Sequence, residues 1–157
     1  MFPYLIYCVE IWGNALSVHT QPLIRLQNKI VRIITQSGPR TRTESLYRDS
    51  GVLPFDTLVK HRIGVLMFKL DKGLTPKSLD NLYTRNRDVH SYFTRQTLHF
   101  HSNRGKNEFI YRTFAFQSVY LWNIIVQNIN INVTFCKFKH TLKEYLISNS
   151  FLLRYGK

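Results

Sequence analysis

The chain is 157 residues long, and 44% of its residues are hydrophobic and 14% aromatic. This is enough apolar material for one domain with a packed core, and it excludes an intrinsically disordered tail. The 22 Lys and Arg residues outnumber the 9 Asp and Glu residues, so the formal net charge is +13. Such an excess predicts an anionic partner, and nucleic acid, either RNA or DNA, is the commonest one.

Two features bear on the cellular compartment. The two cysteines, Cys8 and Cys136, are too few for a disulfide framework, which favours an intracellular setting in the cytoplasm or nucleus. The apolar run over 2–11 contains Pro3 and Glu10 and lacks a basic flank, so it is a poor signal peptide. No apolar stretch reaches the roughly 18 residues that cross a bilayer, and we expect no membrane partner.

Four helices are predicted in the first half of the chain. Apolar residues recur at helical spacing over 4–15, 22–36 and 55–70, and a shorter helical turn is expected over 44–49. The helix over 55–70 is apolar almost all round, so we expect it to be the central buried helix. Gly73 is well placed to cap its C-terminal end.

The helix over 22–36 has two contrasting faces. One face is aliphatic and is expected to be buried; it carries Leu23, Leu26, Ile30, Ile33 and Ile34. The opposite face is basic and carries Arg25, Lys29 and Arg32. No acidic residue lies between these cations in the sequence, so they predict contact with an external anion. An ordinary solvated helix face is the alternative.

The second half of the chain is less regular. Pro76 is expected to open one more short helix. The segment 84–107 has many basic and polar residues and no helical periodicity, so we expect a basic extended loop there. A short strand is predicted over 109–111 and a helix over 115–126, and Thr134 is a suitable N-cap for a last helix.

These elements together predict a mainly α fold. We expect a single compact helical domain over residues 1–157, with about five to six helices and a short β or extended segment. Trp12 and Trp122 fall in helical apolar patterns, so both are assigned to the core.

Catalytic motifs are missing from the sequence. A palm-type polymerase needs clustered carboxylates to hold two metal ions, but the nine acids are scattered and no Asp-Asp pair occurs. His99 and His101 alternate as ligands on a strand would, yet no Cys or acid with ligand spacing accompanies them. Neither a Gly-x-Ser-x-Gly motif nor a phosphate-binding glycine loop is present. We therefore expect no enzymatic activity, no metal, no cofactor and no small-molecule substrate.

Six segments resemble, in order and spacing, the region that follows the polymerase core in jockey-like non-LTR (LINE-type) retrotransposon reverse transcriptases. These enzymes are RNA-directed DNA polymerases of transposable elements. The matching segments are 5–15, 22–35, 42–70, 90–95, 120–123 and 135–146. Two positions depart from the family pattern. Phe93 replaces the usual Asn of a His-Ser-Tyr-Asn-Thr-Arg segment, and 117–121 replaces the Gly-Pro-Lys-Leu that usually precedes Trp-Asn.

The resemblance implies a non-catalytic accessory region downstream of the polymerase thumb. Its role would be to handle template RNA, primer or target DNA, with the remainder of the reverse transcriptase as a second partner. The alternative is a structural or protein-interaction module that packs against the missing polymerase thumb. An exposed apolar surface on the first predicted helix would favour that alternative.

The resemblance assigns no residue roles, so the candidate nucleic-acid-binding residues come from chemistry. Cations suit phosphate contacts, and exposed aromatic rings suit base stacking. The first group of candidates is the basic face formed by Arg25, Lys29 and Arg32. The second group lies in the basic segment: Arg85, Arg87, Tyr92, Phe93, Arg95, Arg104 and Lys106. For the two aromatic residues, the alternative role is to anchor the loop to the core.

Overall fold

The computed structural model describes residues 2–89, 92, 96–97, 99–102 and 107–149. Within these ranges the chain forms nine α-helices and one 3-10 helix, with no strand, so the prediction of a mainly α fold is confirmed. Five of the α-helices have eight or more residues, in agreement with the expected five to six. The other four have only four or five residues.

The chain divides into two compact units. Unit 1 comprises Met1–His61 and Lys143–Lys157, and unit 2 comprises Arg62–Leu142. The boundaries fall inside two long helices, α5 (Phe55–Asp71) and α9 (Phe135–Ser148), so each of these helices contributes residues to both units. The expectation of a single domain stays a prediction.

The first predicted helix is broken into two pieces in unit 1. Helix α1 (Phe2–Ile6) ends just before Cys8, whose φ of 49° lies in the left-handed region, and α2 (Val9–Trp12) follows. The ring of Trp12 packs against Phe55 with the two centroids 5.5 Å apart, although Trp12 is only half-buried. The predicted core assignment therefore holds for one side of this indole.

Helix α3 (Ser17–Ile34) contains most of the predicted second helix, with Pro22 inside it and not in its first turn. The prediction of a buried aliphatic face is wrong for three of its five residues. Leu26, Ile33 and Ile34 are exposed by 43%, 65% and 69%. The residues of α3 that are buried are Thr20, Gln27 and Val31.

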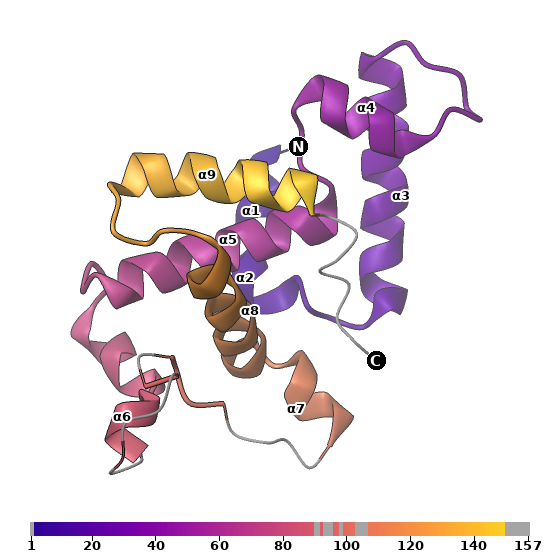
Figure 1. Cartoon of the computed structure of the whole chain (residues 1–157). Coiled ribbons are helices and arrows are strands. Elements are labelled where there is room, and N and C mark those ends of the chain that lie inside the picture. Colours follow the sequence, from indigo (N-terminus) through magenta and orange to yellow (C-terminus); the bar gives the residue numbers. More distant parts are fainter. Residues whose placement is uncertain (1, 90–91, 93–95, 98, 103–106, 150–157) are drawn as a thin grey trace. The chain divides into compact units, whose positions relative to one another are not determined.

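Contacts with α4 (Thr43–Ser50) and the chain after it explain which side of α3 is buried. The side chain of Gln27 donates through Nε2 to the carbonyl of Leu53 at 2.9 Å, and the hydroxyl of Tyr47 donates to Asn28 Oδ1 at 2.8 Å. Figure 1 shows α4 crossing the C-terminal half of α3. A small core joins the two helices and consists of Val31, Leu46, Tyr47 and Val52. Polar residues of α3 thus turn inward because they find partners there.

Helix α5 confirms the predicted buried helix and its predicted end. Gly73 has a φ of 64°, a conformation that glycine adopts without strain. The N–H groups of Gly73 and Leu74 donate to the carbonyls of Leu70 and Lys69 at 3.1 and 2.8 Å. This pair of bonds is the Schellman arrangement that satisfies carbonyls at a helix C-terminus.

Three helices of unit 2 approach one another at Gly64 of α5. A Cβ atom at this position would lie 2.7 Å from the side chain of Leu142 in α9 and 2.9 Å from that of Ile125 in α8 (Phe114–Asn128). A residue larger than glycine would therefore push the helices apart. Trp122 of α8 is 1% exposed, which confirms its predicted place in the core.

The chain between α5 and α8 is made of short elements. These are the 3-10 helix η1 (Lys77–Leu82), α6 (Asn86–Val89) and α7 (Glu108–Arg112). The predicted strand over 109–111 is wrong, because α7 is helical there. A run of three residues is too short for its periodicity to separate a strand from a helical turn.

The described part of the basic segment is extended only locally. It contains one isolated antiparallel bridge, between Arg85 and Phe100. Of the helices that the structure describes, none combines the length and the apolarity that a membrane crossing requires.

Candidate nucleic-acid interface

Helix α3 presents Arg25 and Lys29 to solvent in unit 1. Both residues are exposed, and their spacing of four places them one turn apart on the same side of the helix. Among the described residues, no carboxylate forms an ion pair with either of them. This part of the predicted basic face therefore carries positive charge that no carboxylate of the described residues compensates through an ion pair.

Arg32, the third residue of the predicted basic face, is half-buried and partly bonded. Its Nη2 donates to the carbonyl of Thr41 at 3.3 Å, whereas its Nε is buried without a hydrogen-bond partner. No acceptor among the described residues bonds this buried N–H, so the guanidinium is only partly satisfied by the protein. Burial raises the pKa of Tyr47 to about 12, and the nearby Arg32 charge opposes that rise.

A pocket of about 360 Å³ opens beside these cations at the C-terminal end of α3. Two of its lining side chains are cationic, and none is acidic. It is lined by Lys29, Arg32, Ile33, Gln36, Ser37 and Pro39. The Lys29 ammonium, the Arg32 guanidinium and the Gln36 amide are donors that suit an anion such as phosphate, whereas the Ser37 hydroxyl already donates to the carbonyl of Thr35 at 3.3 Å.

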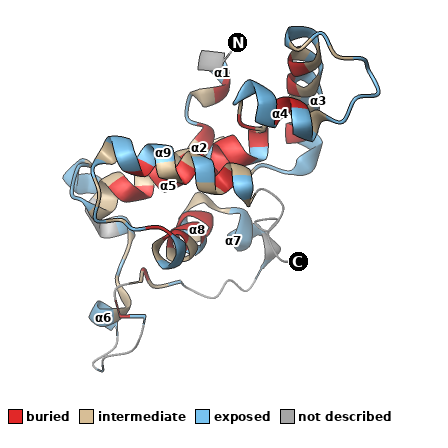
Figure 2. Ribbon diagram, turned by 45° about the horizontal axis from the view of Figure 1, so that its top comes forward, coloured by how far each residue is buried: buried red, intermediate tan, exposed pale blue. Residues whose placement is uncertain are grey.

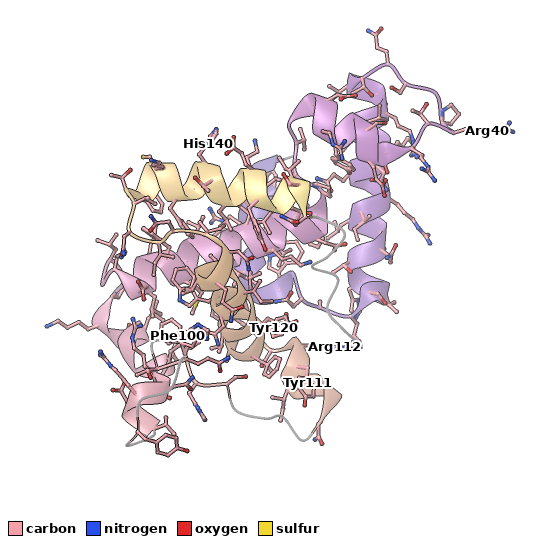
Figure 3. The ribbon with its side chains drawn as sticks, in the orientation of Figure 1. Arg40, Phe100, Tyr111, Arg112, Tyr120 and His140 are labelled. Carbon is pink, nitrogen blue, oxygen red and sulfur yellow. The ribbon has the colours of Figure 1, made fainter. Side chains whose placement is uncertain are left out.

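The turn after α3 fixes the direction in which the chain leaves the pocket. Gln36 has a φ of 51°, and the N–H groups of Gln36 and Ser37 donate to the carbonyls of Ile33 and Arg32 at 3.2 and 2.9 Å. This is a second Schellman arrangement, built without glycine. The loop that follows carries the exposed Arg40, and Figure 3 shows its side chain pointing away from both neighbouring helices.

The contacts of Arg85 favour a structural role over the predicted contact with nucleic acid. Its Nη2 lies 2.7 Å from Asp71 Oδ1, and the two side chains are 25% and 10% exposed. Its guanidinium carbon also lies 5.0 Å from the ring centroid of Phe100, within the range of a cation–π contact. The charge of Arg85 is thus compensated inside unit 2.

The other candidates of the basic segment have different outcomes. Arg87 is exposed and pairs with the equally exposed Asp88, with Nε and Oδ1 3.4 Å apart, a kind of contact that contributes little to stability. Tyr92 is 67% exposed. Four candidates lie outside the described residues: Phe93, Arg95, Arg104 and Lys106.

The sequence analysis missed a group of aromatic residues on α7 and α8, which we call the aromatic ladder: Tyr111, Phe116 and Tyr120. The ring of Tyr111 meets Phe116 edge-on with centroids 4.8 Å apart, and the rings of Phe116 and Tyr120 are nearly parallel with centroids 6.5 Å apart. Tyr111 and Tyr120 are exposed by 41% and 43%. The spacing of four between residues 116 and 120 indicates that these two rings share one side of a helix. Tyr111 could not be grouped with them, because a strand was predicted over 109–111.

The first two helices expose apolar side chains. Tyr4, Tyr7 and Ile11 are exposed by 86%, 78% and 69%. Figure 2 shows that α3, α4, α6 and α7 carry exposed residues as well. Exposed apolar residues on adjacent turns mark a protein-contact surface more often than scattered ones do. This is the feature that favours the alternative, protein-interaction role.

Titratable side chains of unit 2 serve local structure. The hydroxyls of Tyr83 and Ser118 lie 2.7 Å apart; burial raises the pKa of Tyr83, and this hydrogen bond lowers it in part. Burial lowers the pKa of His99. In the part of the chain that the structure describes, no three His, Cys, Asp or Glu side chains gather where they could hold a metal ion.

Comparisons of the chain with protein-family models, with curated proteins and with solved structures found no match. Of the ten predicted binding residues, the structure brings three together in unit 1, at the pocket and on the neighbouring turns of α3. Those three are Arg25, Lys29 and Arg32.

Proposed function

We propose that the chain is a non-catalytic nucleic-acid-binding module that contacts the phosphate backbone through the basic side of α3. One observation carries the proposal. Arg25 and Lys29 are exposed without a carboxylate partner among the described residues, and Lys29 and Arg32 line a pocket at the C-terminal end of α3. Phosphate oxygens of RNA or DNA are the acceptors that such donors need.

The charge of the whole chain supports the same partner. A net charge of +13 attracts a polyanion over a distance of about 10 Å at ordinary salt, and each neutralised phosphate releases counterions, which favours binding. Contacts of this kind position a protein on the strand and carry no sequence information by themselves. We therefore propose binding with little sequence preference.

We further propose that the module is the post-thumb region of a non-LTR retrotransposon reverse transcriptase. The support is the order of the six segments that resemble this family. In that setting the module would help to hold template RNA or target DNA, and the RNA-directed DNA polymerase activity would reside in the rest of the protein.

The test replaces Arg25, Lys29 and Arg32 together by Gln and measures binding to RNA and DNA at several salt concentrations. Each lost phosphate contact lowers the slope of log K against log salt by roughly 0.7–0.9, so the slope should fall by about 2–3. Affinity should fall to a similar extent on unrelated sequences, because phosphates are common to all of them.

A matched control replaces three cations of unit 2, Lys72, Lys77 and Lys137, by Gln. All three are exposed, and the change in net charge is the same. The control should keep most of the salt slope. An equal fall in slope for both variants would mean that binding is diffuse, and it would remove the special role of α3.

A second candidate function is protein interaction, and the exposed Tyr4, Tyr7 and Ile11 favour it. In this role α1 and α2 would pack against an apolar surface of a polymerase thumb. The test adds a separately purified palm and thumb of a jockey-like reverse transcriptase and measures complex formation. Replacing Tyr7 and Ile11 by Ser should abolish the complex, whereas the triple Gln variant of α3 should retain it.

A further inference from the structure

We propose that the aromatic ladder of unit 2 (Tyr111, Phe116 and Tyr120) is a stacking site for the bases of single-stranded nucleic acid. The inference rests on the proposed nucleic-acid function and deepens it, because phosphate contacts alone do not distinguish single strands from duplexes. Bases are accessible for stacking on protein side chains only where they are unpaired.

The three rings of the ladder contact one another in a defined geometry. Phe116 and Tyr120 lie one helical turn apart on α8, with an interplanar angle of 9° and centroids 6.5 Å apart. Tyr111 continues the surface from α7 through its edge-on contact with Phe116 at 87°.

Hydrogen bonds at the junction of α7 and α8 fix the backbone that carries the rings before a ligand binds. The buried Gln117 donates through Nε2 to the carbonyl of Tyr111 and so ties α7 to α8. Thr113 at the junction donates its hydroxyl to the carbonyl of Ile110 at 2.6 Å. A surface that is ordered in advance loses less conformational entropy on binding.

Residues of α8 outside the ladder form its part of the hydrophobic core. The inward side of α8 already supplies Leu121, Trp122 and Ile125, each 2% exposed or less. Tyr120 of the same helix is 43% exposed and does not belong to this buried group. Figure 3 shows Tyr111, Arg112 and Tyr120 at the same end of the α7–α8 pair.

The α7–α8 pair carries few charged residues. The sequence has no acidic residue between Glu108 and Glu144, whereas Arg112 is the last residue of α7 and is exposed. A phosphate beside Arg112 would meet a cation, and Glu108, the first residue of α7, is the one acid of the α7–α8 pair that could repel it.

The experiment compares three probes by fluorescence anisotropy with the full chain: an oligothymidylate of about 20 nucleotides, an abasic strand of equal length, and a duplex. Replacing Tyr111 and Tyr120 together by Leu keeps apolar volume but removes the π faces. This variant should bind the oligothymidylate roughly 10- to 100-fold more weakly. Its affinity for the abasic strand and the duplex should stay within about twofold of the original chain.

The matched control replaces the same two residues by Phe, which keeps the rings, and it should bind all three probes as the original chain does. A second variant, Arg112→Gln, leaves the rings intact and should lower the salt slope by about 1 on the two single strands. Equal losses on the abasic and base-bearing strands would overturn the stacking site, as would an unchanged affinity for oligothymidylate.

Two further outcomes separate this inference from the proposed function. If the original chain binds all three probes with a salt slope that depends on α3, while the Leu variant behaves identically, only the stacking site fails. If the original chain binds none of the probes, both proposals fail. If the Leu variant instead abolishes self-association of the chain in sedimentation and leaves strand binding unchanged, the ladder is a contact between copies.

Discussion

The side-chain amide of Asn123 forms two hydrogen bonds with the backbone of Phe100. Its Oδ1 accepts from the N–H of Phe100 at 3.1 Å, and its Nδ2 donates to the carbonyl of the same residue at 3.0 Å. Asn123 therefore offers Phe100 the same pair of bonds that a neighbouring strand would. Phe100 is 3% exposed, and this clamp holds the basic segment on α8 at residue 100.

Replacing Asn123 by Ala should destabilise the fold by roughly 2–4 kcal/mol, because two buried backbone groups lose their partners at about 1–3 kcal/mol each. Urea denaturation measures the change. Asn128→Ala is the control on the same helix, since Asn128 is exposed and its side chain donates to the carbonyl of Ile124, one turn earlier in α8. Equal effects of the two substitutions would show that the clamp contributes nothing specific.

Gly64→Ala should destabilise unit 2 by roughly 1–3 kcal/mol through overpacking, even though Ala is about 1 kcal/mol better than Gly in a helix. The reason is the contact that the added methyl group would make with Leu142 and Ile125. Leu142→Val, which removes one methylene group, should restore part of the loss in a double-mutant cycle. Gly38→Ala is the control, because its nearest neighbour would be Thr41 Oγ1 at 3.8 Å. Additivity of the two core substitutions would contradict the proposed contact.

Gln36→Gly should stabilise unit 1 by roughly 0.5–1 kcal/mol, because a left-handed conformation costs a residue with a Cβ atom more than it costs glycine. The φ of Gln36 is 51°. Gln21→Gly is a control of the same residue type in the interior of the same helix, at an exposed position. It should have the opposite sign and destabilise by about 1 kcal/mol. The midpoints of thermal unfolding of both variants measure these changes. A loss of stability in Gln36→Gly would contradict the left-handed conformation of residue 36 at the end of α3.

Stability should fall between pH 10 and 12 because of Tyr47. Burial raises its pKa from the usual 10.0 to about 12, so the folded state holds the phenol proton more tightly than the unfolded state does. The resulting stabilisation is fully present below pH 10 and is lost as the pH rises through about 12. The free energy of unfolding of Tyr47→Phe should therefore fall less steeply over this range. Since the Arg32 charge lowers the same pKa, Arg32→Gln should shift tyrosinate absorbance to still higher pH.

The sequence by itself determined where the long helices lie and which of them is most buried. Apolar residues at helical spacing predicted α5 and α8, Gly73 predicted the end of α5, and Trp122 was correctly placed in the core. These features depend on residues within one or two turns of one another. Local propensity and periodicity are therefore sufficient to predict them.

The tertiary structure decided which faces and side chains are available for binding. Helical periodicity marks the more apolar side of α3, but it does not say which side finds a neighbour. The other side is buried, where Gln27 donates to the carbonyl of Leu53 and Asn28 accepts from the Tyr47 hydroxyl. Likewise, the sequence predicts that Arg85 contacts phosphate, whereas the structure pairs it with Asp71, 14 residues away in the chain. Pairings between residues far apart depend on how the helices pack, and that packing is set by all contacts together and not by any single segment.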